Sequence, residues 1–225
     1  MKVETTVIAR IHSDFPTKFG IPRQSGLVGS LRAKIVFEEE YRDANAVRGL
    51  EEFSHIWLIW QFSAAVRSSW SPTVKPPRLG GNTRLGVFAT RSPFRPSPIG
   101  LSCVRLESVT FDEKLGPVLT VSGADLMDGT PILDIKPYIP YADCHPDATE
   151  GFTAQNRDYT LSVEFPETLL MRIPEERREA LCGVLAQDPR PSYQDDPDRV
   201  YGMAFAGFDI RFRVRGNVLT VTEVV

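Results

Sequence analysis

The first two thirds of the chain consist mainly of short segments with the composition of β-strands. Each segment is rich in Val, Ile, Phe and Thr and is bounded by glycine or proline, as strands separated by tight turns are. Many short strands with few helices favour a closed or nearly closed barrel, because closure removes exposed sheet edges. The strands that we expect are residues 2–12, 32–37, 55–62, 84–90, 101–106 and 117–121.

Two segments of this region carry more specific patterns. Residues 55–62 have aromatic and aliphatic side chains on both faces, which is typical of a strand central to the domain. Residues 43–53 place Val47 and Leu50 on one face and charged side chains on the other, which predicts one helix among the strands.

The last third of the chain has a mixed pattern. Residues 159–165 alternate like a strand, and residues 174–185 begin with Pro174 and two acids, as many helices do. Residues 208–224 alternate, turn at residues 215–217 and alternate again, which predicts a hairpin with one buried face.

A polar stretch at residues 144–156 separates the two regions and is interpreted as a boundary or linker. The sequence therefore predicts a mainly β protein of two domains. A β-barrel domain is expected over residues 1–145, and a smaller α+β domain over residues 155–225.

Composition limits the class of protein further. The chain has 225 residues and is 42% hydrophobic, so it can bury a real core. The longest apolar run, residues 56–60, is too short to span a membrane, and no signal-peptide pattern is expected at the start. Three widely spaced cysteines and three histidines argue against a disulfide scaffold, a zinc site or any other metal cluster, and fit a reducing cytoplasm.

Charge is distributed unevenly along the chain. No Asp or Glu lies between Glu52 and Glu107, and we call residues 53–106 the acid-free segment. It carries seven positive charges, so the rest of the chain carries −10 although the total is −3. A local cationic surface attracts polyanions even when the net charge does not. The cations are Arg67, Lys75, Arg78, Arg84, Arg91, Arg95 and Arg105.

The acid-free segment contains a loop that we interpret as a binding site. Residues 89–101 read Ala-Thr-Arg-Ser-Pro-Phe-Arg-Pro-Ser-Pro-Ile-Gly-Leu, with two arginines four positions apart among three prolines. Proline fixes φ and removes backbone donors, so this arginine–proline loop is expected to be stiff and irregular. Two guanidinium groups on a stiff loop suit planar anionic or polar ligands. The alternative is an ordinary solvated surface loop.

Three further polar loops accompany it, at residues 19–26, 78–82 and 125–138. Asp128-Gly129 predicts a tight turn, and Asp134, Lys136 and Tyr138 are expected on one face of the strand that follows. No glycine-rich nucleotide-binding fingerprint and no hydrolase motif is present. Together these loops have a composition suited to a nucleoside-like ligand.

The motifs at residues 22–24, 54–57, 78–81, 86–102 and 128–138 resemble the TsaA-like β-barrel family. More closely, and with residues 185–193, they resemble the TrmO-type tRNA methyltransferases over nearly the whole chain. The resemblance implies S-adenosylmethionine as the cofactor, bound to a barrel, in agreement with the missing glycine-rich fingerprint. It also implies a homodimer that methylates the exocyclic nitrogen of N6-threonylcarbamoyladenosine next to the tRNA anticodon. The smaller domain is then expected to be a tRNA-binding accessory.

The resemblance also implies a set of cofactor-binding residues. We interpret Arg91 as a partner of the methionyl carboxylate, and the backbone of the turn at residues 128–131 as a reader of the adenine edge. Leu101 could pack on the adenine or could equally be an ordinary core leucine. Related chains can carry His-Gln where this chain has Ser63-Ala64. The full set is Pro22, Arg23, Gln24, Ser63, Ala64, Arg91, Leu101, Asp128, Gly129, Thr130 and Pro131.

The acceptor nitrogen of the modified adenosine is a poor nucleophile until its proton leaves. A base and a donor to the carbamoyl oxygen would both help, although orientation alone could suffice. Asp128, Asp134, Lys136 and Tyr138 are unranked candidates, so the catalytic residues are not identified. Arg95 or Lys136 suits the threonyl carboxylate. The expected substrate-binding residues are Arg95, Lys136 and Tyr138.

Two rival functions are consistent with parts of the sequence. A non-catalytic RNA-binding module would need only the acid-free segment and would bind no cofactor. A cysteine hydrolase would use Cys103 with His55, although Cys103 lies in an apolar strand without an evident activating charge.

Overall fold

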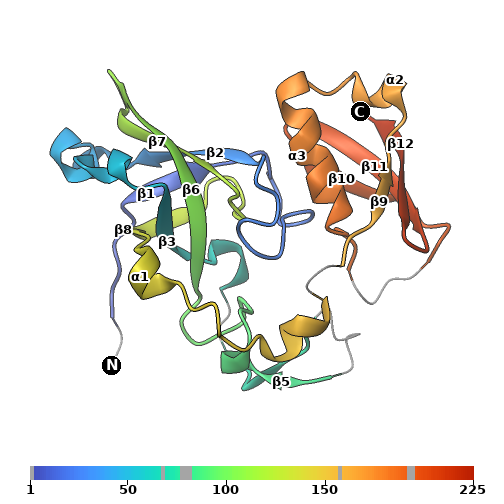
Figure 1. Cartoon of the computed structure of the whole chain (residues 1–225), viewed down its shortest axis with the longest axis horizontal. Coiled ribbons are helices and arrows are strands. Elements are labelled where there is room, and N and C mark those ends of the chain that lie inside the picture. The colour runs from blue at the N-terminus through green and yellow to red at the C-terminus, as the bar shows by residue number, and fades with distance from the viewer. Residues whose placement is uncertain (1–2, 67–68, 77–82, 157–158, 192–195) are drawn as a thin grey trace.

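The computed structural model describes residues 3–66, 69–76, 83–156, 159–191 and 196–225 (Figure 1). Six strands form a closed barrel in the order β1-β2-β7-β6-β3-β8, and every neighbouring pair is antiparallel. The predicted barrel is therefore confirmed. Its strands are β1 (Ala9–His12), β2 (Arg32–Phe37), β3 (His55–Gln61), β6 (Ile99–Asp112), β7 (Gly116–Ser122) and β8 (Pro131–Pro137).

Side-chain alternation explains how these sequences close a barrel. In β3 the buried side chains Ile56, Leu58 and Trp60 alternate with half-buried ones, and β3 lies between β6 and β8 as expected for a central strand. Gly100 of β6 lies directly against the Trp60 ring, where a side chain would collide with the indole. The absence of a Cβ at this position lets the tryptophan fill the barrel interior.

Several expected elements differ from the structure: the strand expected over residues 101–106 is longer, as β6, and the one expected over residues 159–165 is shorter, Ser162–Glu164. The strand expected over residues 2–12 is limited to β1. The strand expected over residues 84–90 is limited to β5 (Leu85–Gly86), which pairs with β4 (Thr73–Val74) and leads into a 3₁₀ turn, Val87–Ala89.

The prediction of one helix over residues 43–53 is wrong. The structure has two 3₁₀ turns there, Ala44–Val47 and Leu50–Glu52. Gly49 separates them with φ +85, a left-handed conformation that ends any right-handed helix. Further short helical segments, in addition to Val87–Ala89, lie between Glu39 and Asn156. They are the 3₁₀ turns Glu39–Tyr41, Ser63–Ala65 and Gly151–Asn156 and the helix α1 (Pro140–Asp143).

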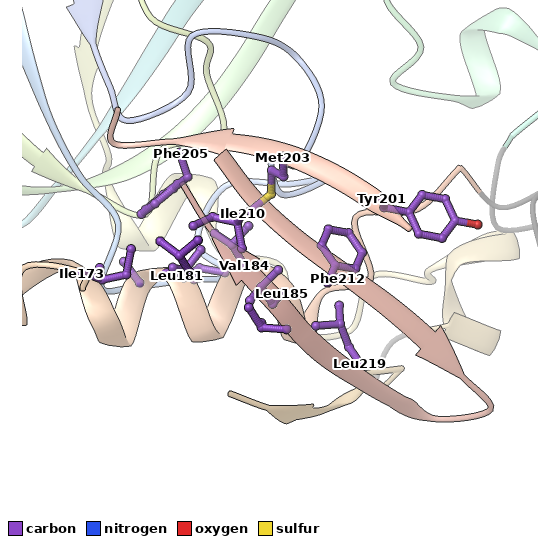
Figure 2. Packing of buried hydrophobic residues seen from close by; sticks show 14 of the residues in the cluster. Ile173, Leu181, Val184, Leu185, Tyr201, Met203, Phe205, Ile210, Phe212 and Leu219 are labelled. Atoms are coloured by element: carbon purple, nitrogen blue, oxygen red, sulfur yellow. The ribbon is translucent and has the colours of Figure 1, made fainter. Parts of the chain in front are cut away.

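The C-terminal unit, residues 159–225, contains a four-stranded sheet in the order β10-β11-β12-β9. The expected hairpin is confirmed as β11 (Phe208–Arg215) and β12 (Val218–Val224), and the expected helix as α3 (Glu175–Ala186), with Pro174 as its N-cap. Figure 2 shows α3 burying Leu181, Val184 and Leu185 against the sheet. The remaining elements are β9 (Ser162–Glu164), α2 (Glu167–Leu170) and β10 (Tyr201–Phe205). No helix in the described part of the chain is long and apolar enough to cross a membrane.

The core of the C-terminal unit also contains side chains from near the start of the chain. Residues 13–31, which we call the β1–β2 connection, bury Phe15, Val28 and Leu31 in that core. In Figure 1 this blue connection extends from the barrel toward the C-terminal sheet. The domain boundaries expected from sequence stay a prediction, but the packing shows that the connection and the C-terminal unit share one hydrophobic cluster.

Candidate active site

Most of the candidate residues gather at one end of the barrel. At this end, which we call the site end, β1, β3 and β7 finish and β2, β6 and β8 begin, as the pairings Gln61–Ile99 and Arg10–Pro131 show. The ends of neighbouring strands in a closed barrel are adjacent in space. Residues 22–24, 63–64 and 128–131 and the arginine–proline loop therefore meet at the site end, although they are far apart in sequence.

Arg91 and Gln24 make the contact that joins two of these segments. Arg91 Nη1 donates a hydrogen bond to Gln24 Oε1 across 67 positions of sequence. Arg91 is exposed, Gln24 is half-buried and the adjacent Pro22 is buried. An exposed guanidinium has five N–H donors, so Arg91 can hold Gln24 and still present donors to an anionic group.

A series of hydrogen bonds between side chains inside the barrel supports the region around Arg91 and Gln24. Trp60 Nε1 donates to Ser102 Oγ at 3.0 Å, and Ser102 Oγ donates to Asp125 Oδ1 at 2.6 Å. Burial raises the pKa of Asp125, while the Ser102 hydrogen bond and the Arg91 charge oppose that rise. Asp125 and Ser102 were not among the residues predicted from sequence. The sequence signal that could have indicated them is the serine at position 102, which lies among the apolar, inward-facing residues of β6. A buried hydroxyl needs a hydrogen-bond partner, so such a serine indicates a polar group close by.

The predicted turn at residues 128–131 is held by β1 and by the start of the β1–β2 connection. The Asp128 amide donates to the Phe15 carbonyl and the Gly129 amide to the Ile11 carbonyl, both at 2.8 Å. Thr130 is buried, and its hydroxyl donates to the Met127 carbonyl.

The turn's backbone donors are therefore used inside the protein. Its exposed side chain is Asp128, whose Oδ1 accepts a hydrogen bond from the Ser13 amide at 3.1 Å and lies 3.4 Å from His12 Nδ1.

Leu101, Ser63 and Ala64 are also at the surface. Leu101 is 53% exposed on the outer face of β6, so the alternative that it is a core leucine is excluded. Ser63 and Ala64 are exposed in the 3₁₀ turn after β3. The Phe62 amide donates to the Pro98 carbonyl at 2.8 Å, which fastens this turn to the arginine–proline loop.

Arg95 braces the arginine–proline loop from within. Its Nη1 donates to the Thr90 carbonyl at 3.1 Å, and its amide donates to the Pro93 carbonyl. Arg95 is half-buried, whereas Arg91 is exposed. The two arginines therefore differ in environment. Arg95 stabilises the loop from within, whereas Arg91 is presented by the loop at the surface.

The structure does not bring Lys136 and Tyr138 to the candidate cofactor-binding residues within one chain. They lie five and seven residues beyond Pro131, which is roughly 17–23 Å at about 3.3 Å per residue. Lys136 Nζ pairs with Asp134 Oδ2 at 2.9 Å. The Tyr138 ring packs on Trp57, with ring centroids 5.8 Å apart. Burial, followed by the nearby Cys144 thiol, raises the pKa of Tyr138, so the phenol stays protonated at neutral pH.

The structure does not support the alternative of a cysteine hydrolase that uses Cys103 with His55. Burial raises the pKa of Cys103, and the Asp143 carboxylate raises it further, so the nucleophilic thiolate is disfavoured. Across the β3–β6 ladder, Cys103 is paired with Trp57, and His55 with Arg105. Over the described ranges, no group of three or more His, Cys, Asp or Glu side chains is arranged to hold a metal ion.

Part of the acid-free segment can also be placed. Lys75 and Arg84 are exposed, and none of the ion pairs between described residues involves either of them. Arg84 Nη1 donates to Thr73 Oγ1 at 3.1 Å. Arg105 differs, because its Nε lies 3.7 Å from Glu107 Oε1. Arg67, Arg78 and the loop at residues 78–82 lie outside the described residues.

Comparison with known proteins covers the whole chain. The family described as tRNA-methyltransferase O N-terminal domain matches residues 10–144, and the TrmO C-terminal domain matches residues 158–225. A tRNA (adenine(37)-N6)-methyltransferase of Escherichia coli is 43% identical over 216 residues, covering 92% of this chain and 91% of the relative. A putative S-adenosylmethionine-dependent methyltransferase, RcsF, of Pseudomonas aeruginosa is 40% identical over 226 residues, covering 96% and 95%.

Solved structures agree with the sequence comparison. A crystal structure of TrmO from Pseudomonas aeruginosa matches with a TM-score of 0.78 and 35% identity, and the match covers 100% of both chains. A closed antiparallel barrel, a convergent set of loops at one barrel end and full-length similarity all point to the same group of proteins. The chain belongs to the TrmO family of tRNA methyltransferases.

Proposed function

We propose that this chain is an S-adenosylmethionine-dependent tRNA methyltransferase that modifies the exocyclic nitrogen of the adenosine next to the anticodon. The proposal specifies N6-threonylcarbamoyladenosine as the acceptor. It rests above all on the contact of Arg91 with Gln24 at the site end of a barrel whose relatives are named as methyltransferases of this kind.

The residues at the site end fit the chemistry of the cofactor. The exposed Arg91 guanidinium suits a carboxylate, and the exposed Leu101 side chain suits an apolar ring edge or face. Gln24, Asp128 and the residues beside them add polar groups that suit ribose hydroxyls and an amine. When bound, S-adenosylmethionine supplies an already activated methyl group. The protein's part is then to bind, orient and exclude water.

The acceptor requires two further tasks of the protein. A positive side chain is needed for the threonyl carboxylate, and Arg95 and Lys136 remain the candidates. A group near the acceptor nitrogen would take its proton, and the carboxylates Asp128 and Asp134 remain candidates for this task. Tyr138, like any tyrosine, carries its hydroxyl proton at neutral pH and can donate a hydrogen bond to a carbamoyl oxygen, and its raised pKa makes proton removal from the acceptor less favourable for it.

Association of two copies is part of the proposal. Phe88, Ile99 and Leu101 are apolar and exposed, at 73%, 42% and 53%, in or directly before the arginine–proline loop of the site end. A second copy covering them would remove this area from water. It would also offer a route by which Lys136 and Tyr138, distant within one chain, reach the cofactor residues of the other copy. A cytoplasmic location, expected from the three cysteines, completes the proposal.

The central test combines calorimetry with a methyl-transfer assay. The protein is titrated with S-adenosylmethionine and then assayed on tRNA that carries the threonylcarbamoyl group and on tRNA that lacks it. Binding with transfer only to the carbamoylated tRNA is expected. Absence of cofactor binding, with tRNA binding retained, would instead support the non-catalytic RNA-binding module. Sedimentation equilibrium of the wild type and of Leu101→Asp tests association, since a charge on this face should shift a dimer toward monomer.

A further inference from the structure

The β1–β2 connection is packed on one side against the C-terminal unit. Its Phe15 is 1% exposed and meets Phe205 edge to face, with ring centroids 5.4 Å apart. Phe19 and Ile21 pack against the same core. Phe15, Val28 and Leu31 of the connection are therefore buried in the core of the C-terminal unit rather than in that of the barrel.

The fit between the connection and the C-terminal unit is close. Gly20 has φ +93, and a Cβ at this position would collide with the Met203 side chain. A Cβ on Gly183 of α3 would lie 2.8 Å from Val28 Cγ1. Two glycines, one on each side of the contact, thus let the backbone of the connection and the C-terminal unit approach each other closely.

Polar groups fix the same contact. Arg177 Nη1 of α3 donates to Asp14 Oδ2 at 2.7 Å, and the Ala206 amide donates to the Asp14 carbonyl at 2.9 Å. The Asp14 side chain is only 12% exposed and that of Arg177 33% exposed. A short ion pair in a largely buried position defines geometry more strongly than a surface pair does.

The other side of the connection touches the site end. The Gly26 amide donates to the Gly123 carbonyl, and Gln24 accepts the hydrogen bond of Arg91. The Phe15 carbonyl accepts from Asp128 of the turn, while the Phe15 side chain lies in the C-terminal core. One residue thus joins the C-terminal core to the turn at residues 128–131.

We propose that the C-terminal unit positions the cofactor-binding segments, and that Asp14 and Arg177 are the positioning residues that hold the β1–β2 connection in place. This role rests on the proposed function of the site end and goes beyond tRNA binding by the C-terminal unit. Loss of the ion pair frees the connection, and residues 22–24 and the turn at residues 128–131 then lose their common support.

The test compares two neighbouring arginines of α3 in the full chain. Arg177→Ala removes the contact with Asp14, whereas Arg178→Ala removes a hydrogen bond to the Ile173 carbonyl within the C-terminal unit. Calorimetry is expected to show a roughly five- to twentyfold weaker affinity for S-adenosylmethionine in Arg177→Ala, the lower part of the usual range for coupled sites. The Arg178→Ala variant should bind as the wild type does. Arg177→Lys, which keeps the charge, should recover part of the affinity.

A second readout does not depend on the cofactor. Hydrogen exchange of the Asp128 and Gly129 amides, and of residues 13–26, should be faster in Arg177→Ala and in Asp14→Asn than in Arg178→Ala. If Arg177→Ala is too unstable to purify, Asp14→Asn provides both measurements.

Three outcomes are distinguishable. Exchange and affinity that change no more in Arg177→Ala than in Arg178→Ala would overturn the positioning role. A wild type that binds no S-adenosylmethionine would overturn the proposed function, and faster exchange at Asp128 and Gly129 in the variants would still support the mechanical coupling. Rescue by Arg177→Lys together with the affinity loss would support both.

Discussion

Arg91 is the residue at which the surface and the interior of the site end meet. Its guanidinium is exposed, holds Gln24 and lies close enough to the half-buried Asp125 for its charge to oppose the rise that burial causes in the pKa of that carboxyl. Asp125 is in turn bonded to Ser102, which accepts a hydrogen bond from Trp60. A guanidinium supported in this way loses less conformational freedom when it binds an anion.

Replacement of Arg91 should therefore weaken cofactor binding. In Arg91→Ala the affinity for S-adenosylmethionine is expected to fall by about 1.5–3 kcal/mol, the usual contribution of a hydrogen bond to a charged group. Titration calorimetry measures the change, and Arg105→Ala is the control, because Arg105 is an exposed arginine of the same segment that lies beside Glu107. Equal affinities in folded Arg91→Ala and wild type would rule out the assignment of Arg91 to the cofactor.

Asp125 should leave a signature in the pH dependence of stability. Burial raises the pKa of Asp125 above its usual 3.8, so the folded state binds this proton more tightly than the unfolded state. The free energy of unfolding then falls as pH rises through the folded pKa, by about 1.4 kcal/mol for each unit of the pKa rise.

Asp125→Asn removes this titration and keeps an oxygen for the Ser102 hydroxyl. The free energy of unfolding of the wild type minus that of Asp125→Asn should decrease as the pH rises from the usual aspartate pKa of 3.8 through the higher pKa of Asp125 in the folded state. Urea unfolding at several pH values gives both curves. A difference that is flat or increases with pH would contradict a raised pKa in the folded state.

At the scale of elements, the sequence predicted what depends on local pattern. Strands β2, β3 and β7 were expected nearly at their observed bounds, because each is a short run rich in apolar and β-branched residues between turn segments. The loops at the site end were found from arginine, proline and glycine content. Their convergence was not predictable from composition, since it follows from the strand order of the barrel.

Two features were beyond the reach of local patterns. The β1–β2 connection reads as a polar loop, and only the tertiary structure shows that Phe15 and Val28 complete a core formed some 150 residues later. The chain Trp60–Ser102–Asp125 likewise joins three elements through side chains. Contacts between side chains that are far apart in sequence follow no periodic spacing, so they cannot be predicted from patterns along the chain.

The missing helix at residues 43–53 leads to a prediction about Gly49. Its φ of +85 is unfavourable for a residue with a Cβ, although no atom lies within 4 Å of the position a Cβ would take. Gly49→Ala is therefore expected to destabilise the fold by about 1–2 kcal/mol through backbone strain alone. Thermal or urea unfolding measures the effect. Gly29→Ala is the control, because Gly29 has equally open space without a positive φ. A more stable Gly49→Ala variant would show that residues 43–53 can adopt the continuous helix after all.

At the scale of the whole molecule, the charge asymmetry of the sequence persists in the structure. Two exposed cations of the C-terminal unit are paired with acids of the same unit: Arg211 with Asp209 and Glu223, and Arg215 with Asp198. Between described residues, Lys75 and Arg84 have no such ion pairs. Within the described residues, Lys75 and Arg84 therefore neutralise no acid of the C-terminal unit, and their positive charge remains at the surface.

This surface charge predicts how tRNA binding responds to salt. Phosphate contacts release counterions, so log affinity falls with log salt concentration by roughly 0.7–0.9 for each contact. Lys75→Ala and Arg84→Ala should each lower tRNA affinity and reduce the slope by about this amount, while the melting temperature stays near that of the wild type. Arg211→Ala is the matched control, since this exposed cation is already paired with two carboxylates. Binding is measured by filter retention at several salt concentrations, with thermal unfolding of the same samples. Removal of a cation that contacts a phosphate also removes the counterions released by that contact, so the slope of log affinity against log salt must change. If this slope stays at the wild-type value in both Lys75→Ala and Arg84→Ala, the tRNA binds elsewhere on the protein.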